Sequence, residues 1–247
     1  MFYLTTGYKL AIVEVFIFGF TAWVLRISTT FNTLNGFVYY WSMFTILTGI
    51  WELFFVLNYD NVVHQAENLI ETKTHVWTSN YTSHDLNPSK FSQIFYSEYG
   101  AYADREYMTD TDTWSRVIES SHSLMCGIFC LLAMINYLFG KSGEFIFTLS
   151  VGMGSQLMNS ILYMANYFNQ VRDRDNVNFN TTSFPSGKYL EKRPFMYINV
   201  FWTMCPLIII FYLLDVLNQR KSNVSINENQ NYKNAKTEKE LLKTYEA

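Results

Sequence analysis

The stretch WSRVIESSHSLMCGIFCLLAMINYLF, residues 114–139, places ionisable side chains at the head of a run long enough to cross a bilayer. Glu119 and His122 lie one helical turn apart, and the residues that follow them are mostly apolar. An ionisable pair in a membrane span is costly unless it faces a cavity or a partner. The stretch therefore predicts a transmembrane helix whose ionisable side chains face a cavity or a polar partner.

Four other runs resemble this one in length and apolar character. The five expected spans are residues 10–25, 37–59, 114–139, 145–168 and 195–217. Since about 20 apolar residues cross the hydrocarbon core, the pattern predicts an all-α integral membrane protein, a five-helix bundle over residues 1–217. Several spans contain Glu, Asn, Thr or Gly, which is typical of helices packed around an internal cavity.

The composition excludes several classes of protein. A net charge of -3 argues against a nucleic-acid partner, which usually requires a basic face. Aromatic residues make up 18% of the chain and charged residues only 16%, which suits contact with a lipid bilayer. Cys126, Cys130 and Cys205 lie in apolar runs without paired histidines, so we expect buried thiols and no metal site. No motif for a cofactor is present.

The segments outside the spans are polar. Residues 60–113 show no regular period, and their part at 64–90 could be a lid or a tolerated loop. Residues 218–247 form a polar tail that we expect to be disordered, with a weak helix at its end as the alternative. Five spans place the two chain ends on opposite sides, and the sequons at Asn80 and Asn180 favour a luminal N-terminus.

Polar residues from three spans lie at one depth. Counted from the N-terminal face at about 1.5 Å per residue, Glu52, Glu119 and Asn199 lie about 6 to 11 Å inside, with Trp202 one turn deeper. A carboxylate facing lipid near mid-bilayer would cost about 2.5–3.5 kcal/mol, whereas two that share a cavity cost less. A pair in which one acid keeps its proton suits a proton donor and a proton acceptor.

A purely structural role for these residues stays open. Neighbouring Ser, Thr and Asn side chains could satisfy Glu52 and Glu119, which would then hold the bundle together. His122 fits a hydrogen-bonded interior histidine equally well. Glu14, four residues into the first span, is expected to be an interfacial or packing residue. The small residues at 152–154 indicate close helix contact.

Four short motifs follow one another with a defined order and spacing. They are ELFFVLNY at 52–59, SEYGAYADREY at 97–107, VIESSHSLMCG at 117–127 and NVFWTMCP at 199–206. Together they resemble the emopamil-binding proteins, the sterol 8,7-isomerases of the EXPERA superfamily. The resemblance covers about residues 40–217, interrupted at 64–90.

The resemblance implies a multi-pass endoplasmic-reticulum membrane protein with a lipid-accessible cavity for a sterol and no cofactor. That family shifts a ring double bond from the 8-ene to the 7-ene position by protonation and deprotonation through a carbocation. By the resemblance, Glu52 and Glu119 handle protons, Asn199 orients a carboxyl group and Trp202 faces the cation. The residues that would contact the sterol are Thr48, Asp104, Tyr107 and Tyr163.

One position departs from the family pattern. The family has a His four residues before its first Glu, where this chain has Thr48, whereas His122 stands where the family has Thr. We expect that the catalytic imidazole has moved to the third span. The alternative is a non-catalytic sterol-binding or sterol-trafficking protein. A proton-coupled transporter would show paired broken helices, which the sequence lacks. The expected partners are the sterol and the bilayer, and a homodimer is left open.

Overall fold

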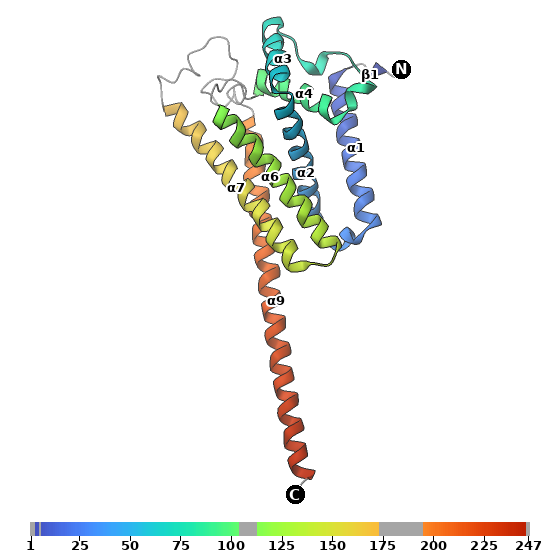
Figure 1. Cartoon of the computed structure of the whole chain (residues 1–247), viewed down its shortest axis with the longest axis vertical. Coiled ribbons are helices and arrows are strands. Elements are labelled where there is room, and N and C mark those ends of the chain that lie inside the picture. The colour runs from blue at the N-terminus through green and yellow to red at the C-terminus, as the bar shows by residue number, and fades with distance from the viewer. Residues whose placement is uncertain (1–2, 5, 104–112, 173–194, 246–247) are drawn as a thin grey trace. The chain divides into compact units, whose positions relative to one another are not determined.

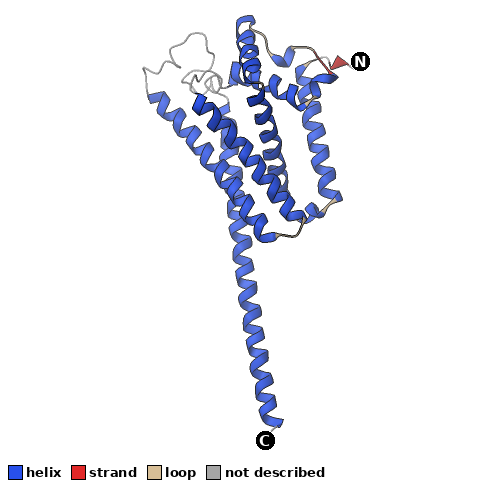
Figure 2. Ribbon diagram, in the orientation of Figure 1, coloured by secondary structure: helices blue, strands red, loops and turns tan. Residues whose placement is uncertain are grey.

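The computed structural model describes residues 3–4, 6–103, 113–172 and 195–245 (Figure 1). The chain divides into two compact units, residues 1–207 and 208–247. The described residues are almost wholly helical, apart from a short two-stranded ribbon (Figure 2). Five of the helices are long and apolar enough to cross a membrane, which is consistent with a multi-pass helical membrane protein.

A helix forms at each of the five expected spans. These helices are α1 (Gly7–Ser28), α2 (Gly36–Leu57), α6 (Thr113–Leu138), α7 (Ser142–Arg172) and α9 (Phe195–Tyr245). Asn35 begins α2, because its side-chain oxygen accepts hydrogen bonds from the backbone N–H groups of Phe37 and Val38. Gly140 has a positive φ of 69° and turns the chain between α6 and α7.

Helix α6 packs against both α2 and α7 (Figure 1). The contact with α2 depends on two glycines: a Cβ on Gly49 would lie 3.1 Å from the Cα of Gly127. The predicted small-residue contact in α7 is confirmed at Gly152, where a Cβ would lie 3.3 Å from the Cβ of Phe129 on α6. It is wrong at Gly154, where a Cβ would meet no atom within 4 Å.

The expectation that residues 60–113 are irregular is wrong for the part that the structure describes. Residues 59–103 fold into a small subdomain, here called the cap. Its elements are α3 (Tyr59–Thr72), η2 (Val76–Thr78), β2 (Tyr81–Thr82), η3 (Ser83–Leu86), α4 (Pro88–Glu98) and the helical turn η4 (Tyr99–Ala103). The apolar spacing of Val62, Ala66 and Leu69 is the helical signal that the sequence analysis missed.

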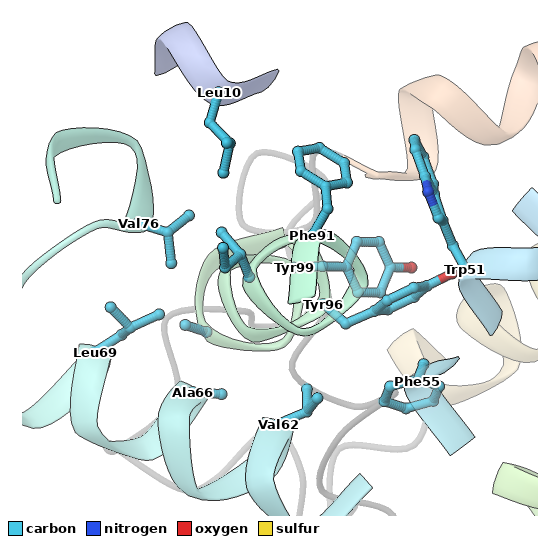
Figure 3. Close-up of a cluster of buried hydrophobic side chains, with 12 residues drawn as sticks. Leu10, Trp51, Phe55, Val62, Ala66, Leu69, Val76, Phe91, Tyr96 and Tyr99 are labelled. Atoms are coloured by element: carbon cyan, nitrogen blue, oxygen red, sulfur yellow. The ribbon is translucent and has the colours of Figure 1, made fainter. Parts of the chain in front are cut away.

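The cap shares one apolar core with α1 and α2 (Figure 3). Leu10 of α1 and Phe55 of α2 pack with cap residues, and the Phe55 ring stacks on the ring of Tyr96 at 4.6 Å. Strand β1 (Tyr3–Leu4) pairs with β2 in antiparallel orientation. The backbone N–H of Gly7 donates to the carbonyl of Ser79. The N-terminus therefore anchors the cap to the end of α1.

The C-terminal region differs from the expected boundary and state. The division between the two units falls at residue 207, inside α9, rather than at residue 217. The polar tail, expected to be disordered, continues α9 as helix to Tyr245. Its sequence AKTEKELLK at residues 235–243 is rich in strong helix formers, which accounts for the difference.

Candidate functional site

A cavity of about 770 Å³ lies within the first unit. Its wall comes from α2, α4, η4, α6, α7 and the start of α9, and one residue of η2. Its volume falls in the range of small-molecule pockets, which is about 300–1,000 Å³. Six of the predicted site residues line it: Thr48, Glu52, His122, Tyr163, Asn199 and Trp202.

Glu52 presents a buried carboxyl group to this cavity from the last turns of α2. The residue is 8% exposed. The hydroxyl of Tyr96, on cap helix α4, donates to its Oε1 atom at 2.6 Å. This contact fixes the position of the Glu52 carboxyl group. The cap thus positions the first predicted acid.

His122 faces the cavity from α6 and is held by α7. Its Nε2 atom lies 2.9 Å from the backbone carbonyl oxygen of Ser155. A carbonyl only accepts, so Nε2 carries a hydrogen in this contact. The other ring nitrogen, Nδ1, lies 3.9 Å from Sγ of Cys126. The hydroxyl of Thr48 donates to the carbonyl of Thr45 in its own helix. Thr48 lines the cavity, but the hydrogen of its hydroxyl group is used in this bond within α2.

Asn199 ties the start of α9 to α7. The residue is 4% exposed, and its Nδ2 atom donates to the carbonyl of Ser160 at 3.2 Å. This bond places Asn199 and, one turn later, Trp202 on the cavity wall. That Asn199 orients a carboxyl group stays a prediction.

Trp202 belongs to a group of three aromatic rings. Its ring packs edge-on against Trp41 at 5.2 Å and stacks on Phe44 at 5.5 Å. Gln156 of α7 fixes the group, because its Oε1 atom accepts from the Trp41 Nε1–H at 2.9 Å. The sequence analysis missed Trp41, Phe44 and Gln156, although Trp41 and Phe44 precede Thr48 on one face of α2.

Glu98 is a second buried carboxylate on the cavity wall that the sequence analysis did not select. It ends α4, is 7% exposed and lies within the motif quoted above at 97–107. Its Oε1 atom lies 2.6 Å from Nδ1 of His75, and its Oε2 atom accepts from the backbone N–H of Val76 at 3.0 Å. The cap therefore contributes polar side chains, Tyr96 and Glu98, to the cavity wall.

Three predicted site residues lie partly or wholly outside the described residues. They are Asp104, Tyr107 and the side chain of Glu119. The backbone of Glu119 belongs to α6, one turn before His122.

Glu14 is buried in α1, at 7% exposed, and does not line this cavity, in agreement with a packing role. The three cysteines are buried, as predicted. Among the described residues, no three His, Cys, Asp or Glu side chains are grouped closely enough to hold a metal.

Three comparisons with known proteins, against family models, curated proteins and solved structures, give no match. The basis for a function is therefore the cavity and the side chains on its wall.

Proposed function

We propose that this chain is a sterol double-bond isomerase of the endoplasmic-reticulum membrane, which shifts an 8-ene to a 7-ene in an intramembrane cavity. The observation that supports the proposal most strongly is the composition of one cavity wall. Glu52 and His122, from different helices, face the same largely apolar space as the ring of Trp202. Two proton-exchanging groups and an aromatic face in one cavity are what a carbocation reaction needs.

The reaction needs only a proton to be added and another to be removed. In the proposed sequence, the protonated His122 gives its Nδ1 proton to one alkene carbon, and the π electrons form the new C–H bond. The neighbouring carbon becomes a cation, which the faces of Trp202 and its two partner rings stabilise. The Glu52 carboxylate then removes an allylic proton, and that C–H pair becomes the new double bond. Return of the proton from Glu52 to His122 restores both groups.

The hydrogen bonds support this division of roles. Glu52 already accepts the hydroxyl proton of Tyr96, which suits an acceptor. The contact of His122 Nε2 with Ser155 orients the ring, and Nδ1, which has the sulfur of Cys126 as a weak partner at 3.9 Å, is the nitrogen proposed to exchange a proton. Thr48 has no proton to exchange near neutral pH. We therefore expect His122→Ala to abolish conversion and Thr48→Ala to preserve most of it.

The test uses full-length protein in detergent, an 8-ene sterol and product analysis for the 7-ene. Glu52→Gln keeps the shape of the side chain and removes its basicity, so the rate of conversion of the 8-ene to the 7-ene should fall by about 10²–10⁴-fold. Glu144→Gln is the matched control, because Glu144 is an exposed acid at the start of α7. Full conversion in Glu52→Gln or in His122→Ala would refute the proposed roles.

A second candidate is a sterol-binding protein without catalysis. The observation that favours it is Thr48, which stands where the isomerase family has a histidine. Binding of the sterol by the wild-type protein without any 7-ene product would support this candidate over the enzyme.

A further inference from the structure

The cap end of the cavity carries a carboxylate that the proposed reaction does not use. We propose that Glu98, positioned by His75, accepts a hydrogen bond from a hydroxyl group of the ligand. The inference rests on the proposed function and assigns the residue that would hold the hydroxyl group of the sterol.

The first argument is the hydrogen-bonding capacity of Glu98. A carboxylate offers about four lone-pair sites. The backbone N–H of Val76 uses one site on Oε2, and Nδ1 of His75 uses one on Oε1. The group is therefore held at both oxygens and keeps further acceptor capacity, and Glu98 is one of the residues that line the cavity. Because it is largely buried, a donor from a ligand would meet little competition from water.

The second argument is the wall around Glu98. Trp77, Phe95 and Tyr102 line the same end of the cavity and present mainly rings. The hydroxyl of Tyr102 lies 2.8 Å from the carbonyls of both Leu69 and Thr74, so its one proton is used within the cap. A ligand hydroxyl that enters this aromatic end would find the Glu98 carboxylate as its charged acceptor.

The third argument is that the carboxylate is held in place before any ligand binds. The His75 ring lies 4.1 Å from the Tyr102 ring, and its side chain is 48% exposed, whereas that of Glu98 is 9% exposed. The imidazole is therefore partly open to solvent, whereas the carboxyl group that it contacts is buried and belongs to a residue that lines the cavity. Because His75 and the backbone of Val76 already hold the carboxyl group, a ligand hydroxyl would meet an acceptor that is fixed in position.

The test measures binding of two probes to full-length protein in detergent: an 8-ene sterol with a free hydroxyl group and its methyl ether. The ether keeps the oxygen and loses the proton that Glu98 would accept. We expect the wild-type protein to prefer the alcohol by about tenfold or more, since a hydrogen bond to a charged group contributes on that scale. Glu98→Gln removes the charge and keeps only a neutral amide carbonyl as acceptor, so the preference for the alcohol should fall below that of the wild type.

Two further variants separate this role from a structural one. His75→Ala removes the contact that positions one oxygen of Glu98, so the preference for the alcohol should shrink without a change in ether affinity. Glu71→Gln, at an exposed acid of cap helix α3, should behave as wild type.

The outcomes distinguish this inference from the proposed function. The wild-type protein could bind the two probes with equal affinity, or Glu98→Gln could keep the full preference for the alcohol. Either result would refute the role of Glu98 and leave the proposed function untouched. Absence of binding to either probe would refute the sterol ligand itself, and with it both proposals. If Glu98→Gln does not fold, as judged by size-exclusion chromatography, the result for His75→Ala decides: an unchanged preference there refutes the inference.

Discussion

Replacing Gly49 by Ala should force α2 and α6 apart at the point where both helices supply the cavity. The new Cβ would lie 3.1 Å from the Cα of Gly127 and 3.3 Å from the carbonyl oxygen of Ser123. Both atoms are backbone, so one helix must move by at least about 0.3 Å to reach the 3.4 Å of ordinary contact. Overpacking of this kind costs about 1–3 kcal/mol.

The control removes the effect of helix propensity. Ala is favoured over Gly inside a helix by about 1 kcal/mol, and this gain applies to any helical glycine. Gly154→Ala on α7 should receive the gain without the clash, because its Cβ would meet no atom within 4 Å. The free energy of unfolding of Gly49→Ala should therefore be lower than that of Gly154→Ala by about 1–3 kcal/mol.

Thermal unfolding of the two variants in the same detergent measures this difference. For a chain of this size, about 1 kcal/mol corresponds to a shift in Tm of about 2–4 °C, so Gly49→Ala should unfold about 2–12 °C below Gly154→Ala. Under the proposed function, the rate of sterol conversion should fall as well, because Glu52 lies one turn after Gly49 on α2. Equal Tm values for the two variants would refute the reasoning that direct backbone contact sets the distance between these helices.

Three further predictions concern the cap. Gly7→Ala should loosen the cap from α1, because the new Cβ would collide with the backbone carbonyl of Val76. A protease should therefore cut the cap faster in this variant than in the control Gly19→Ala, whose Cβ would meet no atom within 4 Å. Burial raises the pKa of Tyr81 above its ordinary value of 10.0, so the folded state holds this proton more tightly than the unfolded state. The resulting contribution to stability is complete below about pH 10 and is lost as the pH rises through the folded-state pKa. Tyr81→Phe should therefore flatten the decline in Tm that is measured above about pH 10. If the cap is luminal, the exposed Asn80 should carry a glycan in a eukaryotic host, and Asn80→Gln should abolish the gel shift; a shift that persists would contradict this orientation.

The positions of the long helices could be predicted from sequence because they depend on local properties. Apolar length and the flanking polar residues are visible in one window of the chain, and helices form at all five predicted places. The same holds for which polar residues enter the site. Glu52, His122 and Asn199 are identified by their cost inside apolar runs, and all three line one cavity. Helix α3 of the cap also has a local signal, the helical spacing of Val62, Ala66 and Leu69. The signal is weak because the segment is short and mixes polar with apolar residues.

The partners of these residues depend on tertiary structure, because each contact joins positions far apart in the chain. Gln156 lies 115 residues from Trp41, whose indole it fixes. Tyr96 lies 44 residues from Glu52, and His75 lies 23 residues from Glu98. No periodicity within a helix predicts which side chain of another helix will meet it. Apolar length thus determines which segments become membrane helices, whereas packing of those helices and the cap determines which polar groups meet in the cavity.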